Sequence, residues 1–445
     1  MEEDKFALVE KIIKDIENVL SKNAELYAFD IVPVDSNFRN KTPVLHLENC
    51  LGLESWCVKH VYMYCYSELM DKYFCKTKRR NSTLGSIHSE KLGRLLSVTL
   101  LLNPELNTLW NKRRDMVLRN LLEKSSELKL TRLVLSRKPK CNEAFGYRRW
   151  LLEAILQDEN LQSNYVQNLV NEELHLCQIA SDKSPNNYHS WNHRMWLLNT
   201  LKKITNFSLD LLYIKEYNFS ERWTSKHVSD FSCFHYRQYC IKNVILHLND
   251  VFWKMFQNSI EIDLRKCFVN VLLKALQNDM TLLNTDENLM EYSDEKLINL
   301  LLSNTRNCNC KHNNVYLCRK FEVLFHELVL NSELIQFYKW HESLWYHRRY
   351  IVHELIISMY EYFGLKKQNG ALVKDNCKKC NSNDLRQKQV KIVRYDCNRV
   401  YSSAIFKVLI SHERKFIAER NGDSDKFAER HEKYLKFVEG LNIVI

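Results

Sequence analysis

One short pattern recurs along this chain: an aromatic residue, two variable positions and an arginine, followed by apolar residues at helical spacing. The five copies are Trp110 with Arg113, Phe145 with Arg148, Trp191 with Arg194, Phe234 with Arg237, and Trp345 with Arg348. The arginines stand 35, 46, 43 and 111 positions apart. The first three intervals are typical of repeats made of two helices, and the last must hold an insertion or a degenerate repeat. The pattern therefore predicts stacked αα-hairpins.

Prolines and capping residues mark the start of each unit. Three of the 5 prolines in the chain stand six positions before an aromatic residue of the pattern: Pro104, Pro139 and Pro185. Proline ends one helix and is tolerated at the start of the next. Residues that can cap a helix N-terminus follow at Asn107, Asn142, Asn187 and Asp230. Each unit is predicted to be a helix, a turn and a capped second helix.

The scarcity of glycine excludes most other fold classes. The 445 residues include only 8 glycines and 5 prolines, whereas an average chain contains about 12% of the two together. Sheet-rich folds need turn residues and nucleotide-binding folds need glycine clusters, so helices are expected instead. Apolar residues at helical spacing predict partner helices at 6–20, 125–137 and 165–180. The predicted fold class is all-α, a solenoid of αα-hairpin repeats.

The rest of the chain divides around these repeats. Residues 1–50 are predicted to form an N-terminal helix and a lead-in, and residues 51–355 to form the helical repeats. Two polar tracts, at about 255–335 and at 356–395, are interpreted as insertions, the second without ordered structure. Residues 396–445 are predicted to return to helices.

Charge and cysteine content limit the partners and the compartment. The chain carries 65 Lys and Arg against 54 Asp and Glu, a net charge of +11 that is spread along the sequence. This excess is compatible with a diphosphate-bearing substrate or an acidic partner; a nucleic-acid-binding repeat is a further hypothesis, which a steep salt dependence of binding would reveal. Cysteines fall inside helical patterns, and neither a signal peptide nor a long apolar run is present. A reducing, cytoplasmic compartment is expected.

The aromatic residue and the arginine of each copy share one face of a helix. The ring is expected to fill the space between the helices of a hairpin. The arginine is expected to stack on the ring or to reach a carboxylate or carbonyl in the next unit. A buried guanidinium is costly unless it is paired, so a repeated arginine implies a repeated partner. A ligand-binding role for all five is disfavoured, because they would be spaced along the solenoid.

The copies also resemble the repeat of protein prenyltransferase α subunits. The third copy carries the family's proline at Pro185 and the Tyr-His pair at Tyr188 and His189, ahead of Trp191. Five copies in order cover roughly residues 95–355. The resemblance implies a right-handed superhelix of hairpins, wrapped as a crescent around a separate β subunit.

Two further segments resemble one branch of that family more closely. These are residues 51–59 and the fifth copy at 341–349, which are similar to the α-subunit repeat-containing proteins of type III protein geranylgeranyltransferase. The resemblance implies that the isoprenoid pocket and the catalytic zinc belong to the β subunit, with no cofactor in this chain. It also implies a β subunit of the Rab geranylgeranyltransferase type as the partner.

A few residues are implied to lie near the diphosphate of the isoprenoid. Lys140 matches the family's lysine after the proline of the second repeat, and Tyr188 and His189 match the Tyr-His pair of the third. Such donors would stabilise the negative charge that grows on the departing diphosphate. Asn142 stands where the family often has tyrosine, which puts that contact in doubt. The alternatives are an ordinary surface lysine and a histidine that caps or packs.

Two short motifs have the spacing of metal ligands: Cys308-x-Cys310-x-His312 and Cys377-x-x-Cys380. Each lies in a polar tract, and a complete site would have to unite both. No metal site is predicted in this chain.

The resemblance as a whole implies the α subunit of a heterodimeric protein geranylgeranyltransferase, inactive alone. It would support transfer of an isoprenoid to a C-terminal cysteine of SNARE-type or Rab-type trafficking proteins. The alternative is a non-catalytic helical-repeat scaffold or adaptor in membrane trafficking.

Overall fold

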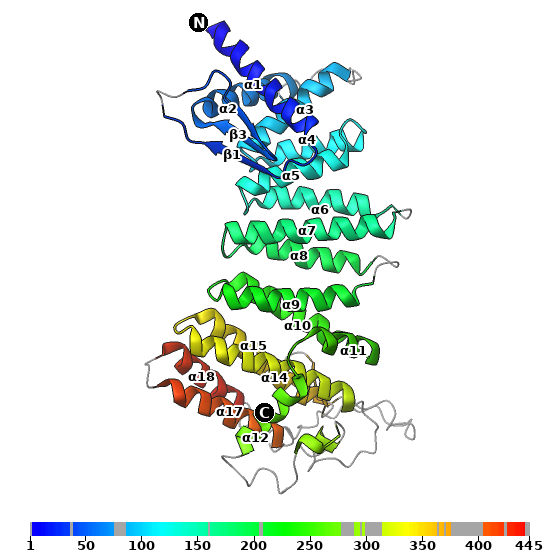
Figure 1. The fold of residues 1–445 in the computed structure, drawn as a ribbon, viewed down its shortest axis with the longest axis vertical. Helices are drawn as coiled ribbons and strands as arrows, with labels where there is room; N and C mark the ends of the chain where they lie inside the picture. The colour runs from blue at the N-terminus through cyan, green and yellow to red at the C-terminus, as the bar shows by residue number, and fades with distance from the viewer. Residues whose placement is uncertain are drawn as a thin grey trace. The chain divides into compact units, whose positions relative to one another are not determined.

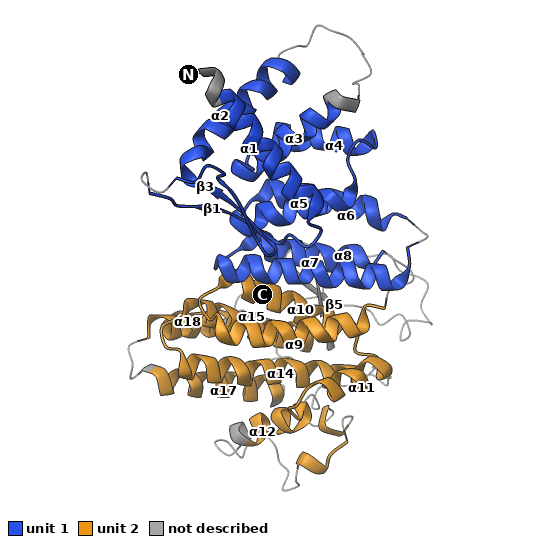
Figure 2. Ribbon diagram, turned by 45° about the horizontal axis from the view of Figure 1, so that its top comes forward, with its two compact units in different colours: residues 1–207 blue, residues 208–445 orange. Residues whose placement is uncertain are grey.

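The fold was taken from a computed structural model. It describes residues 2–35, 39–74, 86–158, 161–203, 208–276, 289–293, 296–298, 314–362, 365–368, 371–374, 404–421 and 425–440. The chain divides into two compact units, Met1–Phe207 and Ser208–Ile445 (Figure 2). Each unit consists mainly of helices, as the predicted all-α hairpin class requires.

The first unit begins with a helix and a small sheet (Figure 1). The sequence analysis predicted the helix but not the sheet. Helix α1 spans Glu2–Lys22, and the strands are β1 (Ala28–Val32), β2 (Val44–Leu47) and β3 (Cys50–Glu54). The central strand β3 pairs parallel with β1 and antiparallel with β2. Phe29 of β1 is buried, and its backbone N–H donates to Ser136 Oγ at 2.9 Å. The sheet is therefore fastened to the repeat helices.

The remaining helices of the first unit pair into hairpins. They are α2 (Ser55–Leu69) with a π-helical extension (Met70–Phe74), α3 (Ser86–Leu102), α4 (Asn107–Leu118), α5 (Lys124–Arg137), α6 (Asn142–Leu156), α7 (Ser163–Lys183) and α8 (Tyr188–Leu201). Helices α5 and α6 form one hairpin, and α7 and α8 form the next. The helices predicted at 6–20, 125–137 and 165–180 correspond to α1, α5 and α7.

The second unit continues the hairpins and holds additional elements. Its elements are α9 (Asp210–Lys226), α10 (Phe231–Leu246), α11 (Asp250–Ser259), α12 (Leu264–Leu276), a 3₁₀ turn (Leu289–Glu291), α14 (Asn314–Phe337), α15 (Glu342–Tyr362), β4 (Leu365–Gln368), β5 (Ala371–Lys374), α17 (Ala404–Asn421) and α18 (Lys426–Gly440). The hairpins are α9 with α10, α14 with α15, and α17 with α18.

The insertion is placed differently from the sequence prediction of about 255–335. Helix α14 packs along α15 as the first helix of a hairpin, so the repeat resumes at residue 314. Helices α11 and α12 lie between the α9–α10 and α14–α15 hairpins along the chain. In the second predicted tract, 356–395, α15 extends to Tyr362 and strands β4 and β5 pair antiparallel. Residues 375–395 lie outside the described part of the chain.

Two of the four predicted helix caps are wrong. Asn187 accepts a hydrogen bond from the Ser190 N–H at 3.2 Å, and Asp230 accepts from the Ser232 N–H at 2.8 Å, so both cap their helices. Asn107 and Asn142 are instead the first residues inside α4 and α6, whose N-cap positions make no side-chain cap hydrogen bond. In all four helices the N-cap stands four positions before the motif ring, and in α4 and α6 that position is held by Leu106 and Cys141.

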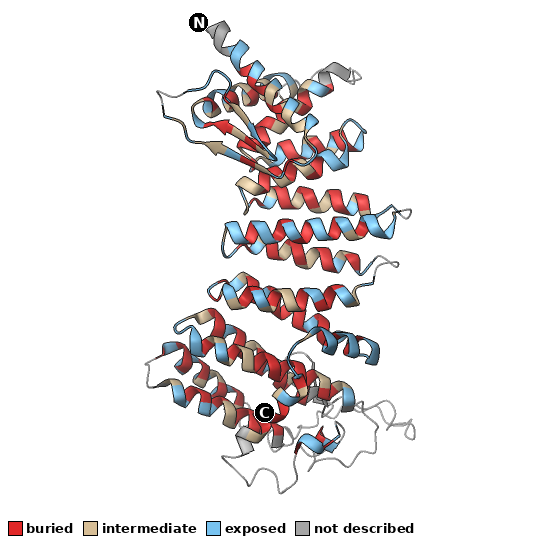
Figure 3. Ribbon diagram, viewed as in Figure 1, coloured by how far each residue is buried: buried red, intermediate tan, exposed pale blue. Residues whose placement is uncertain are grey.

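Buried arginines join successive hairpins, and buried positions, red in Figure 3, recur along the helices of the hairpins. All five motif arginines are buried, and four of them reach a buried glutamate on the first helix of the next hairpin: Arg113 with Glu127, Arg148 with Glu173, Arg237 with Glu327, and Arg348 with Glu413. We call each such pair an Arg–Glu bridge. Arg148 donates from Nε and Nη2 to the two carboxylate oxygens of Glu173 at 2.8 and 2.6 Å. Arg194 donates to the Leu174 carbonyl at 2.8 Å.

Each arginine also grips its own hairpin. Arg148 Nη1 donates to the Leu128 carbonyl at 2.6 Å and to Thr131 Oγ1 at 2.7 Å, both on α5. The carbonyl acceptor lies 20 positions before the arginine here, and also for Arg194 and Arg237. One guanidinium therefore donates to acceptors on two hairpins at once, which offsets the cost of burying it.

In three of the five copies, the residue just before the arginine completes a bridge. These residues are Tyr147, His193 and His347, and each bonds the glutamate of its own hairpin, at 2.7, 3.1 and 2.7 Å respectively. The motif rings contact these same residues. Phe145 lies 5.2 Å from the ring of His193, and Phe234 lies 5.2 Å from that of His347. The rings thus pack onto the next hairpin, in addition to filling their own.

Candidate functional site

Two neighbouring turns of the first unit are held together at one edge. Asn187, which caps α8, donates from Nδ2 to the Pro139 carbonyl in the α5–α6 turn at 2.6 Å. Lys183 Nζ donates to the Ser136 carbonyl at 2.6 Å. These bonds place the residue after Pro139 beside the first residues of α8.

Four hydrogen-bond donors gather at this edge, and we call them the donor cluster: Lys140, Arg149, Tyr188 and His189. Lys140 is exposed in the turn, and Tyr188, the first residue of α8, is 56% exposed. His189 is half-buried, and its ring packs edge-on against that of Tyr188 at 5.9 Å. Helix α6 contributes Arg149.

Burial and the neighbouring charges perturb two members of the cluster, His189 and Arg149. Burial lowers the pKa of His189, and the positive charges of Arg149 and Lys140 lower it further against the opposing effect of Glu143. His189 is therefore a neutral donor at pH 7. Burial also lowers the pKa of Arg149, with Glu153 and Tyr188 acting in the opposite direction. An oxyanion placed here could accept hydrogen bonds from the hydroxyl and the imidazole and would be attracted by the two cations.

The structure brings together Lys140, Tyr188 and His189, which the sequence resemblance singled out. It adds Arg149, which the sequence analysis missed. The available signal was the doubled arginine of the second motif copy, where Arg148 is taken up by its bridge and Arg149 is left for the edge.

In the described part of the chain, no group of three or more His, Cys, Asp or Glu side chains is arranged to hold a metal ion. The motifs at Cys308, Cys310 and His312 and at Cys377 and Cys380 lie outside the described residues. Among the helices that the structure describes, none is both long enough and apolar enough to cross a membrane.

Comparison with known sequences agrees with the fold. The profile of the protein prenyltransferase alpha subunit repeat matches residues 125–155, 170–201 and 213–244. These matches fall on the α5–α6, α7–α8 and α9–α10 hairpins. The copies that begin at Trp110 and Trp345 lie outside the matched segments, although Arg113 and Arg348 form the same bridges.

Relatives cover most of the chain. Protein prenyltransferase alpha subunit repeat-containing protein 1 of Homo sapiens is 30% identical over 362 residues, which is 78% of either chain. Its counterpart 1-B of Xenopus laevis is 29% identical over 370 residues, 79% of this chain and 74% of that protein. Geranylgeranyl transferase type-2 subunit alpha of Saccharomyces cerevisiae is 24% identical over 240 residues, 53% of this chain and 65% of that protein.

The fold, the bridges and the repeat matches define a helical-repeat protein built from αα-hairpins of the prenyltransferase α-subunit type. The chain belongs to the protein prenyltransferase α-subunit repeat family.

Proposed function

We propose that this chain is the α subunit of a heterodimeric protein geranylgeranyltransferase of the type III kind. The observation that carries the proposal is the donor cluster, which lies on two of the three repeats that match the family profile. The name of the more distant yeast relative, the alpha subunit of a type-2 geranylgeranyl transferase, points to the same chemistry.

The partner in this proposal is a β subunit of the Rab geranylgeranyltransferase type. That subunit holds the isoprenoid and a catalytic zinc, and this chain contributes no cofactor. The protein substrates are SNARE-type or Rab-type trafficking proteins with a C-terminal cysteine. The heterodimer works in the cytoplasm, where the free thiols of buried residues such as Cys177 and Cys240 stay reduced.

The role of this chain in the reaction is electrostatic. The substrate thiolate attacks the allylic carbon of the isoprenoid, the carbon–oxygen bond breaks, and the electron pair leaves with the diphosphate. In this proposal Lys140 and Arg149 supply two positive charges that stabilise the leaving group, and Tyr188 and neutral His189 donate hydrogen bonds to it. Alone, the chain holds no isoprenoid and is inactive.

The first experiment tests the partnership. Co-expression with a Rab-type β subunit should give a stable one-to-one complex that transfers a geranylgeranyl group to a peptide ending in cysteine, and the chain alone should transfer none. Transfer by the lone chain would contradict the proposal. A chain that binds no β subunit would instead support the alternative, a helical-repeat adaptor.

The second experiment tests the donor cluster. Lys140→Ala and Arg149→Ala should each slow prenyl transfer by about tenfold or more. Each removes a positive charge whose attraction to the diphosphate is stronger in the transition state than in the bound substrate. Heterodimer assembly should persist. Lys138→Ala is the matched control, since Lys138 is an exposed lysine two positions away and pairs only with the exposed Glu105 at 3.6 Å. Equal rates for Lys140→Ala and Lys138→Ala would remove Lys140 from the site.

A further inference from the structure

Three adjacent cavities that share lining residues form a groove in the first unit, beside helix α5. Its central cavity has a volume of about 620 Å³ and lies between α1, α3, α4 and the first half of α5. A neighbouring cavity of about 210 Å³ shares Arg94 with it, and one of about 450 Å³, reaching Tyr165 on α7, shares Ser126 and Lys129. Lys129 lies in the middle of α5, whereas Lys140 lies in the turn that follows the end of this helix at Arg137.

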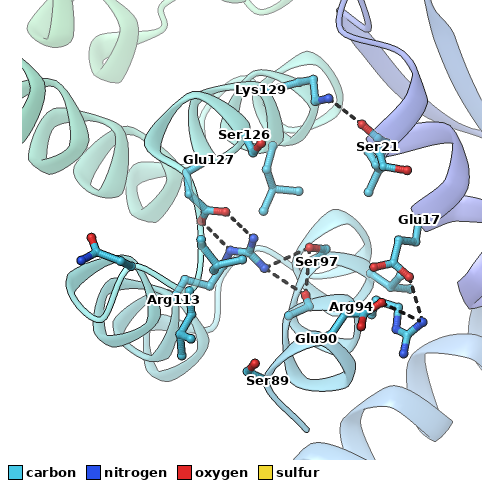
Figure 4. A pocket seen from close by; sticks show the side chains of 17 residues that line it. Glu17, Ser21, Ser89, Glu90, Arg94, Ser97, Arg113, Ser126, Glu127 and Lys129 are labelled. Atoms are coloured by element: carbon cyan, nitrogen blue, oxygen red, sulfur yellow. Dashed lines mark hydrogen bonds and ion pairs between the residues drawn. The ribbon is translucent and has the colours of Figure 1, made fainter. Parts of the chain in front are cut away.

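The central cavity is lined mainly by side chains that are already paired (Figure 4). Arg113 donates to Glu127 at 2.6 Å and to Ser97 Oγ at 2.9 Å. Arg94 lies 3.2 Å from the carboxylate of Glu17. Positive and negative charges therefore alternate along this stretch and offset one another.

The positive charges are no longer offset by carboxylates at Lys129 and Arg132, next to the cavity that extends to α7. Lys129 Nζ donates to the carbonyls of Leu20 and Asn23 at the end of α1, which leaves one of its three N–H donors. Burial, and then the charge of Arg132, lower the pKa of Lys129, and no carboxylate counters them. Arg132 Nε is buried without a hydrogen-bond partner. The hydroxyl groups of Ser125 and Ser126 line the same cavity.

We propose that this groove binds an extended segment of a partner protein, with an acidic side chain of that segment seated on Lys129 and Arg132. The unused donors of these two residues are what a carboxylate requires, and charged donors to a carboxylate form the strong class of hydrogen bond. The length of the groove, over three joined cavities, fits a peptide in extended form rather than a compact ion.

The carboxylates along the groove distinguish a peptide from a nucleic acid. Glu10, Glu17, Glu90 and Glu172 line it on both sides of the cation pair. A strand with a phosphate on every nucleotide would meet these carboxylates over its whole length, whereas a peptide can present its acid at one place only. The groove does not depend on prenyl transfer, since none of its residues belongs to the donor cluster.

The test uses the full chain and fluorescence anisotropy. The probe is a fluorescein-labelled peptide of glycine and serine with two central glutamates, and its counterpart carries two glutamines. We expect the glutamate peptide to bind at least about tenfold more tightly. Arg132→Gln should reduce that affinity about tenfold. Ser126→Asp should do the same by adding a negative charge to the exposed first turn of α5, where an acidic residue also suits the helix.

The matched control is Lys138→Gln, which removes one positive charge from the other end of α5 and should change binding less than twofold. Equal binding of the glutamate and glutamine peptides would overturn the proposal. So would equal losses in Arg132→Gln and Lys138→Gln, or a single-stranded oligonucleotide that binds as tightly as the glutamate peptide. Assembly with a β subunit and prenyl transfer are measured separately, so a failure here leaves the proposed function standing.

Discussion

Removal of one carboxylate from an Arg–Glu bridge should loosen two hairpins at once. Glu173 is fully buried and receives two hydrogen bonds from Arg148 and one contact from His193. Glu173→Gln keeps the shape but leaves the guanidinium of Arg148 buried without a counter-charge. Breaking a buried pair in this way costs about 3–5 kcal/mol. Because 1.36 kcal/mol is a factor of ten, local opening should become roughly 150 to 5000 times more frequent.

Hydrogen–deuterium exchange read by mass spectrometry measures that opening in place. Peptides from α6 and α7 should lose protection in Glu173→Gln, whereas peptides from α1 and the β1–β3 sheet should exchange as before. Local exchange is the suitable quantity because a repeat array of this length need not unfold in one step.

A double substitution separates the bridge from simple packing. Arg148→Met should destabilise the hairpins as much as Glu173→Gln. The double variant Arg148→Met with Glu173→Leu should lose less stability than Arg148→Met and Glu173→Leu measured singly and added together, since no buried charge is left unpaired. Additive losses, or unchanged exchange in Glu173→Gln, would show that the bridge does not join the hairpins. The pH dependence is a second check. Burial alone would raise the pKa of Glu173, but Arg148 and His193 lower it to about 2. The stabilisation is therefore complete above about 4.5 and is lost as the pH falls toward 2.

Two further substitutions test other parts of the structure. Burial lowers the pKa of His326 from 6.5 to about 4, so stability should fall as the pH drops below 6.5, by about 2 kcal/mol between pH 7 and pH 5. In His326→Leu, the unfolding free energy measured with urea should fall by about 2 kcal/mol less between pH 7 and pH 5 than in the unchanged chain. An equal fall in both proteins would contradict the lowered pKa of His326. Asn187→Ala should cost about 1–2 kcal/mol, because it removes the α8 cap and the bond to Pro139. Asn142→Ala, at an exposed position that caps nothing, should stay within about 0.5 kcal/mol in the same thermal scan.

The repeat and its helices could be predicted because their signals are local. The ring and the arginine of each copy lie three positions apart on one helix face, and apolar spacing marks α1, α5 and α7. The sheet could not be predicted in the same way. Its strands have four or five residues each, and β1 and β3 pair across a 22-residue separation that leaves no periodic trace.

The glutamates of the bridges show which signal was present and which was absent. Within a hairpin the spacing is constant, since Glu127, Glu173 and Glu327 each stand 20 positions before the tyrosine or histidine that bonds them. From an arginine to its glutamate the spacing varies: 14, 25, 90 and 65 positions for Arg113, Arg148, Arg237 and Arg348. The connecting segment sets that distance, so no fixed pattern could reveal the partner.

The donor cluster was predicted in part for a related reason. Lys140, Tyr188 and His189 follow motif landmarks, and family resemblance was enough to name them. Arg149 lies beside Tyr188 in the donor cluster, whereas the adjacent Arg148 points into the core and bonds Glu173. Which of the two arginines does which depends on the three-dimensional packing.

The separation of Arg237 from Glu327 has a consequence for how such a chain can grow. Although 90 positions separate Arg237 and Glu327 in the sequence, the two side chains still form an Arg–Glu bridge. New segments can therefore be inserted between two hairpins while the bridge that joins them stays the same. The direction of growth is also defined, because the α5–α6 and α14–α15 hairpins each accept one guanidinium and offer another. In the α17–α18 hairpin, His431 still bonds Glu413, but the next residue is Glu432 where earlier hairpins have arginine. At the position of the motif arginine, that hairpin therefore carries a carboxylate in place of a guanidinium.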